Sequence, residues 1–271
     1  MHFATREEIT LRLGSDWVQN AVHFGSIPLH PLGEQSFYQF VMGAKNPTET
    51  RERMAVIFQH FSIDVLAASL FAWNLMISAR LVRRRPRTIA TQCCLIQSVV
   101  GLVCAIAGMS GSLPVGPSCR ALTWVTTASV RIGDLCVGAV LLQKAYIVTN
   151  RNRRLFFFIP VIAAAAPALL YASWSSPAII TAGSGCIFIY PEYFPWLRFG
   201  LHAPMNIVLT GIFLNVVYRQ WRQFGTRAWE QLAKEGILVG LLMLLSNLLC
   251  TFIIAFEVFG LYSIMILLAD W

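Results

Sequence analysis

The sequence predicts an all-α membrane protein, a bundle of seven transmembrane helices whose seventh span is incomplete in this chain. Three observations lead to this prediction: the composition, the lengths of the apolar stretches and the placement of the basic residues. Of the 271 residues, 56% are hydrophobic and only 13% are charged, whereas a soluble domain carries about 25% charged residues. This shortage of charge indicates that most of the chain after residue 54 lies in a bilayer.

The apolar stretches give the expected spans. A helix rises about 1.5 Å per residue, so about 20 apolar residues cross the hydrocarbon core of a bilayer. The stretches lie near residues 55–79, 89–110, 119–148, 155–174, 196–218, 237–256 and 261–271. The last stretch supplies only about half of the residues that a crossing needs. We expect the span to continue beyond Trp271, with a segment that only dips into the membrane as the alternative.

The amino-terminal segment, residues 1–53, is more polar than the bundle of residues 54–271 that follows it. We interpret it as an extracellular lid or surface helix, with a dedicated ligand-binding module as the alternative. Asn46 followed by Pro47 is typical of a helix start, because proline fits the first helical position. The first helix is therefore expected to begin well before the apolar part of its span.

The Lys and Arg residues alternate from one side of the predicted bundle to the other. The connections after the first, third and fifth spans contain basic clusters, and those after the second, fourth and sixth contain no Lys or Arg. Cytoplasmic loops of membrane proteins carry the excess of Lys and Arg. We therefore expect a multi-pass protein of the plasma membrane, with an extracellular amino terminus and with its basic turns in the cytoplasm.

The net charge of +8 does not indicate nucleic-acid binding, because the basic residues form short clusters beside apolar spans. The lipid bilayer is the partner that this pattern predicts. No signal peptide is expected, because Met1–Gly14 lacks an apolar core. The sequence has no H-E-x-x-H, no G-x-S-x-G, no P-loop and no Cys/His ligand spacing, so we expect neither an enzyme nor a cofactor or metal site.

Two of the seven cysteines lie on the predicted outer side. Cys119 opens the third span, and Cys186 lies in the glycine-rich connection after the fourth. An oxidising exterior favours a disulfide between them, which would hold this connection over the mouth of the bundle; two free thiols are the alternative. The other five lie in apolar spans and are expected to behave as small buried hydrophobic residues.

Four charged residues fall at a similar depth of the predicted bundle: Asp64, Arg131, Asp134 and Asp270. Arg131 and Asp134 are on one helix face and can pair. Ionisable groups at such depth are costly and mark functional sites by default, with a closed structural ion-pair network as the alternative. Three carboxylates against one arginine favour a bound cation, a held proton or a cationic ligand. His202, in the outer half of the fifth span, is interpreted as a hydrogen-bonded bundle residue, with a ligand contact as the alternative.

Seven spans, an outer amino terminus, a cysteine that opens the third span and another in the second outer connection together resemble G-protein-coupled receptors of the rhodopsin-like class. The resemblance is to a divergent member, because the sixth span lacks proline and tryptophan. Lys144 lies in Gln143-Lys144-Ala145-Tyr146, where such receptors carry an acidic-Arg-aromatic triplet. The resemblance implies an extracellular ligand that binds within the bundle and a heterotrimeric G protein as the cytoplasmic partner.

The resemblance also implies which basic residues meet that partner. They lie at the cytoplasmic ends of the third and fifth spans: Lys144, Arg151, Arg153, Arg154, Arg219 and Arg222. Ligand binding would shift the inner ends of the fifth and sixth spans and expose these residues. A second hypothesis is an ion- or proton-coupled transporter or channel that uses the intramembrane Asp and Arg residues as a relay. A scaffolding membrane protein is the third.

Overall fold

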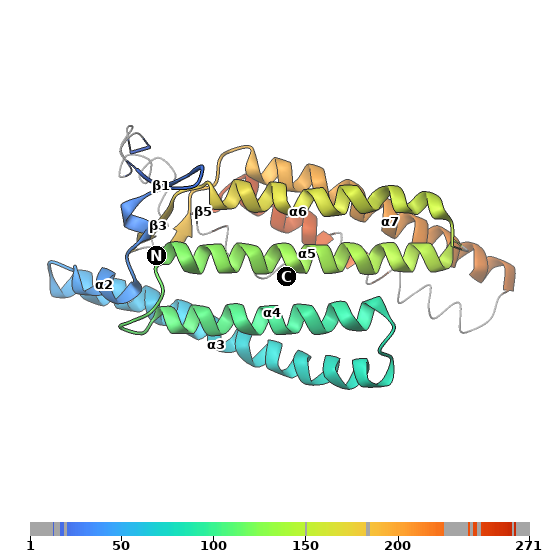
Figure 1. Cartoon of the computed structure of the whole chain (residues 1–271), viewed down its shortest axis with the longest axis horizontal. Helices are drawn as coiled ribbons and strands as arrows, with labels where there is room; N and C mark the ends of the chain where they lie inside the picture. The colour runs from blue at the N-terminus through green and yellow to red at the C-terminus, as the bar shows by residue number, and fades with distance from the viewer. Residues whose placement is uncertain are drawn as a thin grey trace.

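The structure is a computed structural model, and it describes residues 21–149, 151–182, 185–224 and 245–261, together with the single residues 13, 17, 18, 238, 241, 242 and 263. It is mostly helical, and its long helices lie side by side (Figure 1). Five of them are long and apolar enough to cross a bilayer. They are α3 (Pro47–Arg84), α4 (Ile89–Gly111), α5 (Cys119–Val148), α6 (Phe158–Trp174) with the preceding 3-10 turn η2 (Arg153–Phe157), and α7 (Phe194–Phe224).

The outward faces of these helices are apolar. On α3 the side chains of Phe58, Leu66, Leu70 and Trp73 are between 63% and 72% exposed. A continuous apolar surface of this kind is unfavourable in water and suits the hydrocarbon core of a bilayer. The structure therefore supports a multi-pass membrane protein, and the first five predicted spans are confirmed as helices.

The seven-helix bundle is not confirmed in the described part of the chain. The predicted sixth span, residues 237–256, contains the shorter apolar helix Leu245–Ala255. This helix stops because Glu257 adopts a left-handed backbone with φ of 46°, and strand β5 (Val258–Leu261) follows. Residues 264–271, which the sequence assigns to the seventh span, lie outside the described residues.

Helix α3 is longer than the predicted first span at both ends. It begins at Pro47 with Asn46 as its N-cap, as the Asn-Pro pair predicts, and it therefore extends across the boundary drawn at residue 53. At the other end it continues through Arg80 and Arg83 to Arg84. Arginine is a good helix former, so the helix need not stop where the apolar stretch does.

Two short antiparallel hairpins, which the sequence analysis did not predict, lie at one end of the bundle (Figure 1). The amino-terminal segment forms β1 (Val22–Phe24) and β2 (Ile27–Leu29), followed by η1 (Pro31–Gly33) and α2 (Phe37–Met42). The connection between α6 and α7 forms β3 (Ala178–Thr181) and β4 (Gly185–Phe188), in which Cys186 lies opposite Ile180. All residues of β3 and β4 are buried, so this hairpin is part of the core.

Helix α5 occupies the centre of the assembly. It contacts α4, α6 and α7, and it also contacts both strands of the β3–β4 hairpin (Figure 1). Because the helices run up and down, the basic turns after α3 and α5 lie at the end of the bundle opposite the hairpins (Figure 1). The structure thus places the Cys119 end and the basic turns at opposite ends of the bundle.

Two glycines of α4 allow α3 to approach closely. A Cβ atom on Gly101 would lie 2.4 Å from the ring of Phe71, and one on Gly108 would lie 2.3 Å from Asp64 Oδ2. The two glycines are two helical turns apart, and so are their partners, so both pairs lie on the facing sides of the helices. Small residues permit such close packing between membrane helices. Phe71 and Asp64 therefore occupy the space on α4 that side chains at Gly101 and Gly108 would fill.

Substituting Gly101→Ala is expected to destabilise the protein by about 1–3 kcal/mol, because the added methyl group has to displace the Phe71 ring. The matched control is Gly211→Ala in α7, where a Cβ atom meets nothing within 4 Å. That change should be neutral or stabilising by about 0.5–1 kcal/mol, because alanine favours a helix over glycine. Thermal unfolding of both variants in one detergent measures the difference, and equal melting temperatures would contradict the close α3–α4 contact.

A candidate ligand cavity between the first three long helices

A cavity of about 100 Å³ lies between α3, α4 and α5, with β4 along one side. Its wall combines aromatic and aliphatic side chains with one carboxylate, one imidazole, one guanidinium and three threonine hydroxyls. The lining residues are Phe37, His60, Asp64, Gly108, Leu122, Thr123, Thr126, Thr127, Val130, Arg131, Cys186, Ile187 and Phe188. A few polar groups in an apolar concave wall are typical of small-molecule sites.

The acidic side of the cavity comes from α3. His60 and Asp64 are one turn apart, which places both on the face of α3 that meets the cavity. The Asp64 carboxylate rests against Gly108 of α4. Among the residues that the structure describes, the Asp64 carboxylate has neither a hydrogen-bond donor nor a cation as partner. Its negative charge is therefore available to an occupant of the cavity.

The basic side of the cavity comes from α5. Arg131 is only 3% exposed, and its Nη1 lies 2.8 Å from Asp134 Oδ2. The ion pair predicted from the spacing of these two residues is thus present in the structure. His202 of α7 approaches the same carboxylate oxygen at 3.6 Å through Nε2. Arg131, Asp134 and His202 therefore form a polar chain that runs from the cavity wall on α5 to α7.

The structure brings together most of the intramembrane residues that the sequence singles out. Asp64 and Arg131 line one cavity without pairing with each other, while Asp134 and His202 lie behind Arg131. Asp270 falls outside the described residues. A buried charge that already has a partner is held in place by it, so the pair on α5 provides a fixed wall and Asp64 provides the unmatched charge.

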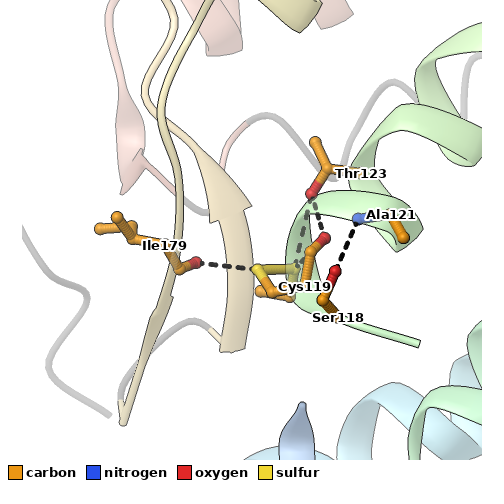
Figure 2. The surroundings of a disulfide bond; sticks show 6 residues. Ser118, Cys119, Ala121, Thr123 and Ile179 are labelled. Atoms are coloured by element: carbon orange, nitrogen blue, oxygen red, sulfur yellow. Dashed lines mark hydrogen bonds between the residues drawn. A yellow bond between two sulfur atoms is a disulfide. The ribbon is translucent and has the colours of Figure 1, made fainter. Parts of the chain in front are cut away.

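The disulfide between Cys119 and Cys186 is present, and it fixes β4 to the first turn of α5. Figure 2 shows its surroundings: Cys119 Sγ lies 3.3 Å from the carbonyl oxygen of Ile179 on β3, and the Thr123 hydroxyl donates to the carbonyl of Cys119 at 2.9 Å. Ser118 caps α5 by accepting a hydrogen bond from the amide of Ala121 at 3.4 Å (Figure 2). Because Cys186 lines the cavity, the disulfide holds one wall of the cavity in place.

Gly185 is the first residue of β4. Its φ of +69° lies in the left-handed region that side chains disfavour. A Cβ atom at this position would lie 2.4 Å from Nε2 of His60. The glycine therefore lets the hairpin lie directly against the side chain of His60, which is one of the residues that line the cavity.

The amino-terminal segment packs over the same end of the bundle. The amide of Cys119 donates to the carbonyl of Gln35 at 3.0 Å, and Arg120 forms an ion pair with Glu34. Phe37 is buried against the disulfide and contributes to the cavity wall. Burial lowers the pKa of His30 in this segment, and a hydrogen bond with the backbone of residue 13 partly opposes that shift. The described part of the segment is thus packed on the core, with Phe37 reaching the cavity.

The six basic residues assigned to the cytoplasmic side lie at the far end of the bundle. All are exposed: Lys144, Arg151, Arg153, Arg154, Arg219 and Arg222. The turn that carries three of them is held by local contacts, because Asn152 caps η2 and the ring of Phe156 stacks on Tyr146 at 5.2 Å. The structure therefore presents a positively charged surface at this end, separate from the cavity.

Sequence reasoning missed several residues of the cavity. His60 lies one turn before Asp64 within the predicted first span, and only that spacing could have pointed to it. Thr123, Thr126 and Thr127 resemble ordinary residues of an apolar span. The β3–β4 hairpin had a signal, since Ala-Ile-Ile-Thr and Gly-Cys-Ile-Phe flank Ala182-Gly183-Ser184, and a short connection that contains glycine between two strand-forming runs is a hairpin signal.

The sequence matches no model of a known protein family, and no curated protein matches it significantly. The function therefore has to be inferred from the cavity and from the charges around it.

Proposed function

We propose that this protein is a receptor-like, seven-span protein of the plasma membrane, with an extracellular amino terminus, that binds a small extracellular ligand in the cavity between α3, α4 and α5. The observation that carries the proposal is the cavity itself. It lies at the hairpin end of the bundle, it is bounded by a disulfide-anchored hairpin, and it holds the unmatched carboxylate of Asp64.

The remaining parts of the structure support a signalling role. The polar chain Arg131–Asp134–His202 joins the cavity wall on α5 to α7. The basic surface that includes Lys144, Arg219 and Arg222 lies at the other end of these two helices. A ligand that binds one arrangement of α5 and α7 more tightly than another would raise the fraction of molecules in that arrangement. The basic surface at the far ends of these helices would change with it. A heterotrimeric G protein is the proposed cytoplasmic partner.

The experiment that tests this proposal is nucleotide exchange on purified G proteins. The full chain in lipid nanodiscs is expected to raise GTP-analogue binding by at least one class of heterotrimeric G protein above that of empty nanodiscs. Lys144→Ala should lower this basal exchange, because Lys144 is an exposed cation at the basic end. The matched control, Lys45→Ala, removes an exposed cation at the hairpin end and should have no effect. If no class of G protein responds, coupling to G proteins is wrong.

The second candidate is an ion- or proton-coupled transporter or channel. The observation that favours it is the succession of ionisable groups from Asp64 through Arg131 and Asp134 to His202, since such groups in a membrane mark ion and proton pathways. Proteoliposomes containing the full chain separate the two candidates. Proton or sodium flux that Asp134→Asn abolishes would favour the transporter, whereas impermeable liposomes together with nucleotide exchange would favour the receptor.

A further inference from the structure

We propose that the cavity takes a small organic cation: the Asp64 carboxylate pairs with the ammonium group, and the rings of Phe37 and Phe188 pack against its carbon part. This inference rests on the proposed function, because it names the chemical class of the ligand for the same cavity. It follows from the charges of the lining, from the size of the cavity and from the nature of its wall.

The charges favour a cation over an anion. The positive charge of Arg131 is already matched by Asp134 at 2.8 Å, and an anionic ligand would have to compete with that carboxylate. Asp64 has no cation beside it among the described residues. A carboxylate at this depth without a counter-ion is costly. A cation that enters the cavity removes this cost, whereas an anion adds to it.

The size and the wall favour an organic cation over a metal ion. The cavity of about 100 Å³ is about two thirds of the volume that holds one benzene molecule, so it has room for a compact ammonium group with a short carbon stem. A divalent metal such as calcium needs about six to eight oxygen ligands, and no cluster of three or more metal-binding side chains occurs among the described residues. The rings of Phe37 and Phe188 in the wall can also attract a cation through their faces.

Two of the three threonine hydroxyls of the lining donate to the helix backbone. The Thr123 hydroxyl donates to the carbonyl of Cys119, and that of Thr127 donates to the carbonyl of Thr123, each at 2.9 Å. The Thr127 oxygen also accepts a hydrogen bond from Trp174 Nε1 at 3.1 Å, which leaves one of its two lone pairs. The Thr123 oxygen, which lies 3.4 Å from Cys186 Sγ, keeps acceptor capacity as well. An ammonium group is a donor without acceptor capacity, so it suits this arrangement.

The test uses two thiol reagents of similar size and opposite charge, the ethylammonium and ethylsulfonate derivatives of methanethiosulfonate. Thr126, a half-buried residue of the cavity wall, is replaced by cysteine in the full chain. The five free cysteines are replaced by alanine, and the Cys119–Cys186 disulfide is kept. Val115→Cys, at a position that is 97% exposed between α4 and α5, provides the matched control. Intact-mass spectrometry measures the rate of modification at each site.

After normalisation to Val115→Cys, the cationic reagent is expected to modify Thr126→Cys about ten times faster than the anionic one, because the Asp64 charge attracts the first and repels the second. Adding Asp64→Asn should bring the two rates to within about twofold, and Asp64→Glu should keep the preference. Ethylammonium chloride should slow the cationic reagent, and sodium ethanesulfonate should not.

Three results would overturn the proposal: a rate ratio that Asp64→Asn leaves unchanged, a preference for the anionic reagent, or no reaction of Thr126→Cys with either reagent. The assay reads the charge preference of the cavity without any signalling partner. A cation preference without nucleotide exchange would therefore keep the ammonium site and remove the receptor function. Nucleotide exchange without a cation preference would keep the receptor function and remove the ammonium site.

Discussion

Arg131→Ala is expected to lower the free energy of unfolding by about 3–5 kcal/mol, because it leaves the largely buried carboxylate of Asp134 without its main partner. Arg131 is 3% exposed, and its Nη1 lies 2.8 Å from that carboxylate. The change would also remove one wall of the cavity. Chemical unfolding of the full chain in lipid–detergent micelles measures the loss.

Two further variants show whether the ion pair is the cause. Arg154→Ala removes an exposed arginine of the basic turn and should change stability by less than about 0.5 kcal/mol. The double change Arg131→Met with Asp134→Leu should recover most of the lost stability, because apolar residues of similar size can replace a buried pair at little cost. If Arg131→Ala and Arg154→Ala unfold at the same denaturant concentration, the buried pair does not stabilise this protein.

Replacing both Cys119 and Cys186 by alanine is expected to cost about 4 kcal/mol, as the chain-entropy model gives for a loop of this length. The two cysteines are 67 residues apart in the sequence, and their bond ties β4 to α5. Its loss would release one wall of the cavity. The melting temperature of the double variant should therefore fall, and a reducing agent should no longer affect it.

The control for the disulfide is Cys136→Ala, which removes a buried cysteine that forms no disulfide. A small core truncation of this kind costs about 1 kcal/mol, which is well below the expected loss of the disulfide. The single variants Cys119→Ala and Cys186→Ala should each match the double variant, because either one breaks the same bond. A double variant no less stable than Cys136→Ala would show that the bond contributes little to stability.

Helix positions could be predicted from the sequence because they depend on local composition. The predicted third span and α5 have the same bounds, Cys119–Val148, since Ser118 caps its start and the apolar run ends where the basic turn begins. The depth of the charged residues could also be estimated from the helical rise, and Asp64 and Arg131 do line one cavity. The pairing of the two outer cysteines is likewise confirmed.

The parts that could not be predicted depend on contacts between distant segments. The β3–β4 hairpin is short, and a two-stranded sheet is marginal on its own; here it is stabilised by α5, by Phe37 and by the disulfide. His60 lines the cavity and lies against Gly185 of this hairpin, a contact between segments far apart in the sequence. Apart from its spacing to Asp64, no pattern within α3 distinguishes such a histidine from one at a helix surface.

The close packing of α3 against Gly101 and Gly108 of α4 has a consequence for how the helices can move. Sliding α3 along α4 would force the Phe71 ring out of the space above Gly101 and the Asp64 carboxylate out of the space above Gly108, and packed contacts of this kind do not deform continuously. We therefore expect these two helices to move together. Any displacement that an occupant of the cavity produces is then expected between these two helices and α5, which forms the opposite wall of the cavity, and distance measurements across that boundary are where motion should be sought.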